Sequence, residues 1–213
     1  MTSRDASTLA PLAERLGALP LELELSRPEQ IEAAVDATIE ALGGLDILVN
    51  NAGLSIHAEA LELDVADWDR VFETNLRGVF LLSRAAARVM KGRGGGRIVN
   101  LSSPFARVGL PRRAAYSASK AGLEQLTRTL AVEWAPYGIT VNAVSPTTVV
   151  TETRAELFRD EEARQARTRQ IPLGRLGTPE DVVGPVLLLC GEAGSFVTGE
   201  TILVDGGYTV RRW

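Results

Sequence analysis

The sequence contains few of the residues that build disulfides and metal sites. Among 213 residues there is one cysteine, Cys190, and one histidine, His57. A single cysteine cannot form an internal disulfide, and an unpaired one is typical of the reducing cytoplasm. These two residues are also too few for a zinc or iron–sulfur site. We therefore expect a cytoplasmic protein without a bound metal.

Long apolar runs and long runs of one charge are also absent. No stretch is apolar for long enough to span a bilayer, and the N-terminus has no hydrophobic signal core. The net charge is −4, with no long basic run, so we expect neither nucleic acid nor a membrane as a partner. With 45% hydrophobic residues, a chain of this length most simply forms one globular domain.

What is present is an alternation of short β-rich runs with longer helical ones. Residues 19–25 (LPLELEL) alternate apolar and polar side chains, as a strand with one dry face does. Continuous apolar runs that end in small polar residues indicate buried parallel strands, and four of them cover residues 45–53, 96–103, 138–146 and 200–207. Helices are expected at about 28–42, 65–91, 114–135 and 179–191, the first and last capped by Ser26 and Thr178.

This alternation predicts an α/β fold, a doubly wound parallel sheet with helices on both faces. Ligands bind to such sheets beyond the carboxyl ends of the strands. Asn51, Ser103 and Thr147 lie where three of the predicted strands end. We therefore expect these polar residues to gather at one edge of the sheet.

Tyr116 and Lys120 open the predicted helix 114–135 and share one of its faces. A tyrosine with a pKa near ~10 is a poor proton donor at neutral pH. An ammonium held ~4 Å away would favour the phenolate by about 4 kcal/mol at an effective dielectric of 20, or about three pKa units. With Ser103 holding a substrate oxygen, the pair suits proton transfer to a carbonyl or from an alcohol. Taken alone, the same spacing also occurs by chance on helix surfaces.

Five motifs, taken in order, carry a resemblance to a known family. They are LVNNAG (48–53), NLRG (75–78), VNLSS (99–103), YSASK (116–120) and VNAVSP (141–146). With these motifs the chain resembles the short-chain dehydrogenase/reductases, Rossmann-like enzymes that move hydride between NAD(P) and small-molecule carbonyl or alcohol substrates. The similarity extends from about residue 3 to about residue 210. It implies an NAD(P)-dependent oxidoreductase that interconverts a carbonyl and a secondary alcohol.

The resemblance also implies roles for individual residues. Tyr116 would be the catalytic acid/base, and Lys120 would lower its pKa and bind the nicotinamide ribose. Ser103 would orient the substrate oxygen, and Asn75 would hold a water that joins Lys120 to a proton relay. Together with Tyr116 and Lys120, the implied cofactor-binding residues are Arg4, Glu24, Leu25, Asn51, Ala52, Gly53, Val149 and Thr151. The resemblance further implies a loop at 152–175 that closes over substrate, although a solvated charged helix accounts equally well for most of its side chains. It also implies a homodimer or homotetramer paired through the helices expected at 65–91 and 114–135.

The start of the chain departs from the family pattern. The family opens with a strand, a glycine-rich TGxxxGxG turn, a helix and a second strand, and Met1 falls where that second strand should be ending. We expect one N-terminally truncated Rossmann-like domain over residues 1–213, without the first strand and most of the second. In the family's strand order, 3-2-1-4-5-6-7, this loss leaves the strand at 19–25 unpaired and bares two buried edges.

Three explanations of this start compete. In the first, the start codon is set too late or the sequence is clipped, and the native enzyme is longer. In the second, the chain is a fragment that fills the gap through a partner or a rearrangement. In the third, it is a cofactor-free relative that acts as an interaction or structural protein. The intact catalytic set favours the first explanation.

Single residues bear on the cofactor and the substrate. An arginine at the position of Arg4 favours NADP(H) over NAD(H), because a guanidinium can bind the ribose 2′-phosphate with two hydrogen bonds. Glu24 replaces the Asp or Asn that commonly meets the adenine, and Thr147 replaces a glycine. We interpret His57 as a substrate-pocket or loop residue. Three residues suggest an apolar substrate component, although each could equally pack in the fold: Phe105, Leu110 and Phe158.

Overall fold

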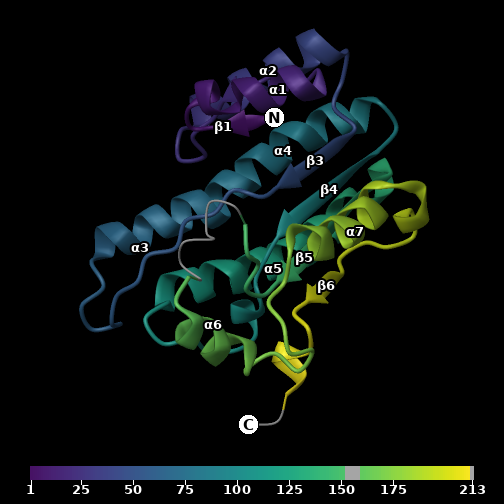
Figure 1. The fold of residues 1–213 in the computed structure, drawn as a ribbon. Helices are drawn as coiled ribbons and strands as arrows, with labels where there is room; N and C mark the ends of the chain where they lie inside the picture. Colours follow the sequence, from purple (N-terminus) through teal and green to yellow (C-terminus); the bar gives the residue numbers. More distant parts are fainter. Residues whose placement is uncertain (152–158, 212–213) are drawn as a thin grey trace.

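A computed structural model describes residues 1–151 and 159–211, and their strands form two parallel sheets (Figure 1). The larger sheet has the order β3-β4-β5-β6, and the smaller pairs β1 with β2. The strands are β1 (Thr2–Ser3), β2 (Leu21–Glu22), β3 (Ile47–Asn50), β4 (Gly96–Leu101), β5 (Ile139–Pro146) and β6 (Thr201–Val204). The predicted α/β fold with a parallel sheet is confirmed.

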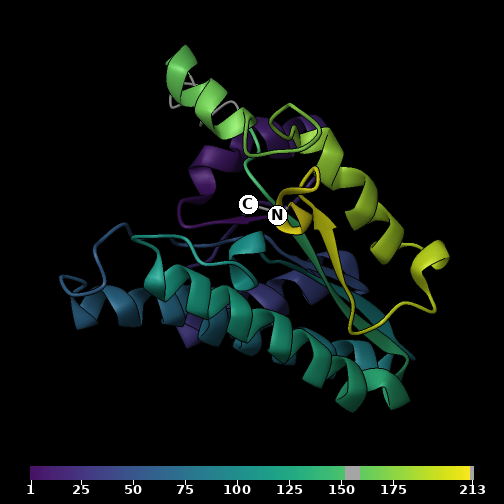
Figure 2. The ribbon, with the colours of Figure 1, turned by 90° about the horizontal axis from the view of Figure 1, so that it is seen from below.

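Helices cover both faces of the larger sheet. The α-helices are α1 (Ala10–Leu16), α2 (Pro28–Leu42), α3 (Val65–Phe72), α4 (Val79–Gly92), α5 (Ala114–Trp134), α6 (Glu161–Thr168) and α7 (Pro179–Cys190). The short helices are η1 (Ala6–Leu9), η2 (Glu73–Gly78), η3 (Pro104–Ala106), η4 (Ala135–Tyr137), η6 (Glu192–Gly194) and η7 (Tyr208–Val210). Helices α4 and α5 lie on one face of the sheet and α7 on the other (Figure 2).

The core lies between the central strands and these helices. Ile98 and Val99 of β4 and Val141 and Val144 of β5 are 0% exposed. Burial of such side chains supplies the main driving force for folding. β4 and β5 are the most deeply buried of the described strands. Among the described residues, no helix has the length and apolar character needed to cross a membrane.

Several predicted boundaries hold and others do not. Helix α2 covers residues 28–42 as predicted, but its N-cap is Arg27 and not Ser26. Thr178 does precede α7, and its amide donates to the Asp181 carboxylate at 2.8 Å. The strand expected over 19–25 is reduced to the two residues of β2, and α1 was not predicted.

The helix expected over 65–91 contains a π-helical turn, η2, between α3 and α4. A π-helical turn is rare and often marks a functional site. Here it carries Asn75, which is 0% exposed. The turn therefore sets one of the predicted catalytic residues into the protein interior.

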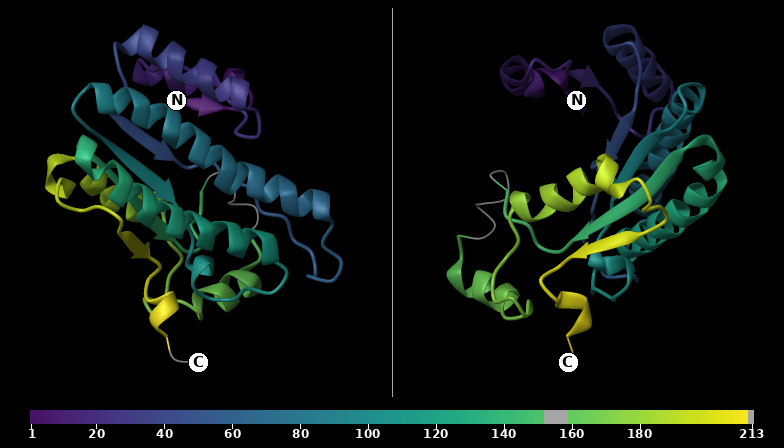
Figure 3. Two further views of the ribbon diagram at one scale, coloured as in Figure 1. Left: turned by 180° about the vertical axis from the view of Figure 1, so that it is seen from behind. Right: turned by 90° about the vertical axis from the view of Figure 1, so that its right-hand side faces the viewer.

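The two sheets stand apart (Figure 3), and one of the core clusters connects them, with Leu21 of β2 and Leu48 of β3 both packed against it. Leu23 and Leu25, which follow β2, belong to the same core cluster as Leu82 of α4. The expectation that the strand after residue 19 is left unpaired is wrong, because β2 pairs with β1. Within the described residues β3 pairs only with β4, and its Ile47 is 47% exposed.

Candidate active site

Tyr116 and Lys120 lie in the first two turns of α5, beside the carboxyl end of β4. The Lys120 side chain is only 4% exposed, and its Nζ donates a hydrogen bond to the Leu101 carbonyl oxygen at 2.6 Å. The same Nζ lies 5.9 Å from the centroid of the Tyr116 ring. Burial lowers the pKa of Lys120 to about 8. Lys120 and Tyr116 share one face of α5 as expected, but the ammonium lies farther from the Tyr116 ring than the ~4 Å assumed from the sequence, and its effect on the phenol stays a prediction.

Ser102 and Ser103 end the same strand but serve different partners. The Ser102 hydroxyl donates to Glu124 at 3.1 Å, so it points toward α5. Ser103 caps η3, and its hydroxyl oxygen accepts the Phe105 amide at 3.4 Å. Because η3 packs against α5, Ser103 stands at the same edge of the sheet as Tyr116. Of the two serines, Ser103 is the one suited to hold a substrate oxygen.

The Asn75 side chain ties the loop after β3 to α5. Its Nδ2 donates to the Leu54 carbonyl at 2.8 Å and to the Ser119 hydroxyl at 3.0 Å, and its Oδ1 accepts the Leu54 amide at 2.7 Å. Ser119 in turn donates to the Tyr116 carbonyl at 2.8 Å. The Asn75 amide thus fixes the frame around Tyr116, and the water assigned to Asn75 by the resemblance stays a prediction.

Asn51, Ala52 and Gly53 form an exposed segment directly after β3. A Cβ on Gly53 would lie 3.6 Å from both the Asn75 Oδ1 and the Lys120 Nζ. Small residues here let a ligand approach the backbone beside a buried ammonium. These residues fit the ribose next to a nicotinamide, which presents hydroxyl groups.

The described residues offer the pyrophosphate of a dinucleotide a poorer fit, because a glycine-rich turn that opens a helix is what usually binds it. Among the described residues, no glycine-rich turn follows a strand and opens a helix. The described residues thus fit the nicotinamide half of the cofactor better than its pyrophosphate.

The other predicted cofactor residues are divided between the two sheets. Arg4 is exposed just after β1, and Glu24 follows β2. Leu25 is buried, and its carbonyl oxygen would lie 2.4 Å from a Cβ on Gly78, so Leu25 packs against the π-helical turn. Val149 and Thr151 follow β5, and Val149 forms a parallel bridge with Gly177.

Basic side chains surround His57 in the loop after β3. Desolvation, followed by the charges of Arg113, Arg112 and Arg167, lowers the pKa of His57. Arg113 also donates to the Ser55 hydroxyl. The placement of His57 in a loop agrees with the prediction, while a contact with substrate stays a prediction.

Phe105, one of the predicted apolar contacts for a substrate, packs edge-to-face on Tyr208 with 6.0 Å between ring centroids. Leu110 is partly buried, and Phe158 lies outside the described residues. Part of the substrate loop expected at 152–175 is the charged helix α6, and residues 152–158 lie outside the described residues. The structure thus gives Phe105 a packing partner within the protein.

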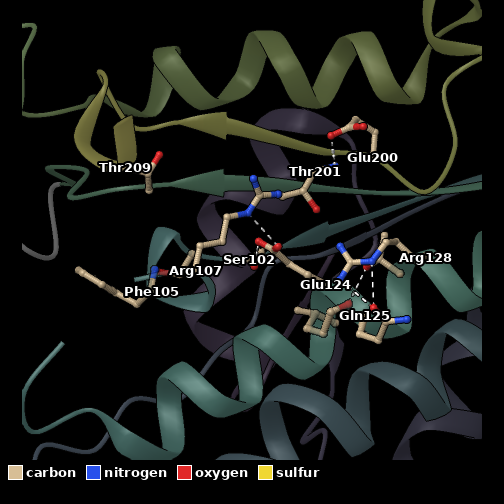
Figure 4. Close-up of polar contacts among 12 residues, drawn as sticks. Ser102, Phe105, Arg107, Glu124, Gln125, Arg128, Glu200, Thr201 and Thr209 are labelled. Carbon is tan, nitrogen blue, oxygen red and sulfur yellow. Dashed lines mark hydrogen bonds and ion pairs between the residues drawn. The ribbon is translucent and has the colours of Figure 1, made fainter. Parts of the chain in front are cut away.

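A buried carboxylate that was not predicted from the sequence lies beside this site. Glu124 lies one helical turn after Lys120, is 4% exposed, and binds both Ser102 and Arg107 (Figure 4). The one available signal is its spacing from Lys120, which places it on the buried face of α5. A glutamate in a helix is otherwise expected at the surface.

Comparison with known proteins places this arrangement among nicotinamide-dependent enzymes. The sequence model of a family described as enoyl-(acyl carrier protein) reductase matches residues 1–209. The chain is 39% identical to an NAD-dependent glycerol dehydrogenase from Listeria innocua, over 91% of this chain and 76% of that protein.

Solved structures of other proteins resemble this chain in the same way. A short-chain type dehydrogenase/reductase from Mycobacterium marinum is 36% identical, with a TM-score of 0.91 over 99% of this chain and 85% of that one. A gluconate 5-dehydrogenase from Burkholderia cenocepacia, solved with NADP and tartrate, is 33% identical, with a TM-score of 0.93 over 100% of this chain and 85% of that one. The similarity therefore extends along the whole chain.

Proposed function

The chain belongs to the short-chain dehydrogenase/reductase family, and we propose that the residues around its buried lysine carry out the reaction. It is an NAD(P)-dependent oxidoreductase that interconverts a carbonyl and a secondary alcohol by hydride transfer. The alternative of a non-catalytic interaction or structural protein is not favoured, because the named relatives are dehydrogenases.

Tyr116 acts in this proposal as the acid/base at the substrate oxygen. In the reductive direction its hydroxyl gives a proton to the oxygen, and in the oxidative direction it takes the proton back. The Ser103 hydroxyl donates a hydrogen bond to the same oxygen and polarises the carbonyl. When bound, the nicotinamide cofactor supplies hydride to the carbonyl carbon or accepts it from the alcohol carbon.

Lys120 supplies a positive charge beside the proton-transfer site. The observation that carries the proposal is its Nζ, buried between the Leu101 carbonyl and the Tyr116 ring, with Asn75 and Gly53 alongside. An ammonium in a buried site interacts with nearby charge more strongly than in water. We place the nicotinamide ribose against Lys120 and the exposed segment 51–53, with Val149 and Thr151 beside the carboxamide.

We further propose NADP(H) as the preferred cofactor. Arg4 is exposed directly after β1, where a guanidinium can meet a ribose 2′-phosphate. Glu24 and Leu25 would border the adenine. The complex of gluconate 5-dehydrogenase with NADP lends support by analogy.

The proposed setting is a cytoplasmic homodimer or homotetramer acting on a small-molecule carbonyl or alcohol. Helix α5 exposes Val132, which is 77% accessible, and α3 exposes Trp68. Exposed apolar side chains on neighbouring long helices suit pairing with a second copy.

The test measures nicotinamide absorbance with a panel of small ketones and secondary alcohols for Tyr116→Phe and for Tyr137→Phe. Tyr137 is a matched control, because it also lies under a lysine, with the Lys91 Nζ 3.9 Å from its ring centroid, but on the surface. Tyr116→Phe should lower kcat by at least about a hundredfold without changing the unfolding temperature, and Tyr137→Phe should keep wild-type kcat. Equal kcat in both variants would remove Tyr116 from the mechanism.

A further inference from the structure

We propose that Glu124 is a positioning residue that holds the Ser103 hydroxyl where it can contact the substrate oxygen. The inference rests on the proposed function, because it assigns Ser103 its catalytic contact. Glu124 does not touch the substrate in this proposal. It acts through Ser102 and Arg107, which flank Ser103 in the chain.

The Glu124 carboxylate holds the segment 102–107 at both ends. Its Oε1 accepts the Ser102 hydroxyl at 3.1 Å, and its Oε2 accepts the Arg107 Nε at 3.1 Å. The Arg107 side chain reaches back from the end of η3 toward α5 (Figure 4). One residue thus closes a short loop whose interior includes Ser103.

Two residues on successive turns of α5 hold Leu101, the last residue of β4, and Ser102, which follows it. Lys120 donates to the Leu101 carbonyl at 2.6 Å, and Glu124, one turn later, accepts from Ser102. Tyr116 lies one turn earlier on the same helix. Because the three helical residues are spaced by four, they share one face and move together. Two residues on the face of α5 that carries Tyr116 thus hold the two residues directly before Ser103.

A second contact holds the other side of this segment. Phe105 packs edge-to-face on Tyr208 of η7, with the ring planes at 85°. Phe105, Val108 and Tyr208 belong to one small apolar cluster. The chain after Ser103 is thus fixed between α5 and the C-terminal segment, which leaves little freedom for the serine hydroxyl.

Stability alone does not account for a charge at this position. The Glu124 side chain is 5% exposed, whereas that of Arg107 is 39% exposed, so the carboxylate is removed from water more completely than its partner. A buried ion pair replaced by apolar side chains of similar volume often leaves a protein equally or more stable. The two hydrogen bonds that the Glu124 carboxylate makes to the segment 102–107 explain better why a charge lies on the buried face of α5.

The test combines three variants: Glu124→Gln, the apolar double variant Glu124→Leu/Arg107→Leu, and Glu133→Gln as the control. Glu133 lies on the same helix and is exposed. For each, kcat, the KM for the nicotinamide cofactor, the unfolding temperature and the hydrogen exchange of the segment 103–108 (its amides other than Pro104, which has none) are measured.

Glu124→Gln and the double variant should each lower kcat about tenfold or more, because small misplacements of a catalytic group are costly. The cofactor KM should stay within twofold, and exchange at 103–108 should accelerate about tenfold. The double variant should unfold near the wild-type temperature, because relief of the buried carboxylate offsets the lost acceptor of the Ser102 hydroxyl, and Glu133→Gln should match wild type throughout.

A double variant that keeps both stability and wild-type kcat overturns the proposal, as does slowed turnover with unchanged exchange at 103–108. A merely structural role predicts a lower unfolding temperature for Glu124→Gln, with kcat recovered in the double variant. If the wild type itself shows no turnover, the proposed function fails. The exchange data then still decide whether Glu124 holds the Ser103 segment, and unchanged exchange overturns that as well.

Discussion

The larger and smaller sheets differ in strand length, in burial and in the residues they present. β5 has eight residues, seven of them buried, whereas β1 has two residues and neither is buried. Ser103 follows β4 and caps η3, which packs against α5, and the exposed Arg4 follows β1. The residues proposed for proton transfer therefore stand on the larger sheet, and those proposed for the far end of the cofactor stand on the smaller one.

This difference shows which functional groups must be held in precise positions. Proton and hydride transfer require groups held in place by packing and by hydrogen bonds from the surrounding residues. The network around Asn75 and Lys120 supplies both. Recognition of a ribose or phosphate by an exposed arginine tolerates more freedom, and a two-residue strand is enough to present it.

The largest expected effect follows from removing the charge at Lys120. Lys120→Met should lower kcat by at least about a hundredfold, the scale seen when a preorganised electrostatic group is removed. The same variant should unfold at a higher temperature at pH 7, because it relieves the burial of an ammonium. Measurements of turnover and of thermal unfolding on the same preparation check the expected kcat and the expected unfolding temperature. A variant that loses stability instead would show that the Leu101 hydrogen bond outweighs the cost of burial.

A pair of truncations tests the difference in packing between the sheets. Ile98→Ala in β4 should reduce the free energy of unfolding by about 3 kcal/mol, because it leaves a cavity in a fully buried site. Leu16→Ala in α1 removes a side chain that is 60% exposed and should cost less than about 0.5 kcal/mol. Denaturant titration measures both, and similar losses would contradict the comparison.

The pH dependence of stability tests the burial of Lys120. An unfolded lysine has a pKa near ~10.4, and the folded pKa is about 8. Between these values the unfolded chain binds the extra proton, so stability rises with pH across this window and the full cost is present below it. The gain should approach about 3 kcal/mol. Subtracting the profile of Lys120→Met isolates this lysine, and a flat difference would place its folded pKa near the ordinary value.

The smallest expected effect concerns the smaller sheet. Arg4→Ala should weaken NADPH binding severalfold, as expected for one exposed ion pair, and leave NADH binding unchanged. Fluorescence titration with each cofactor measures the ratio. Equal weakening of both would remove the 2′-phosphate as the partner of Arg4.

Local patterns predicted the elements with clear end signals. Pro28 marks the start of α2 and Pro179 that of α7, and the apolar runs gave β4 and β5 to within two residues. A two-residue strand leaves no periodicity to detect, so the short length of β2 could not be predicted, and only the family resemblance indicated a strand end near β1. A π-helical turn of six residues is too short to change the apolar pattern of the long helical run around it, so the geometry of Asn75 was hidden.

The residues proposed as catalytic could be named from the sequence because they stand in motifs, whereas the residues that hold them in place could not. Tyr116, Lys120 and Ser103 are recognisable from order and spacing. Glu124 was not, because a glutamate in a helix is ordinary and only packing against the end of β4 shows that it is buried. The role of a residue such as Glu124 depends on contacts between segments far apart in the sequence, and a local sequence pattern does not reveal these contacts.

The most direct test of the account is fluorescence titration of NADPH into the wild type, Tyr116→Phe and Lys120→Met. The account predicts saturable binding of equal affinity to the wild type and to Tyr116→Phe, because the phenol serves proton transfer, and binding at least about tenfold weaker to Lys120→Met, which loses a charged ribose contact. Equal binding to all three proteins would contradict the placement of the nicotinamide ribose at Lys120. Absence of binding to the wild type would contradict the claim that this edge of the sheet holds the cofactor.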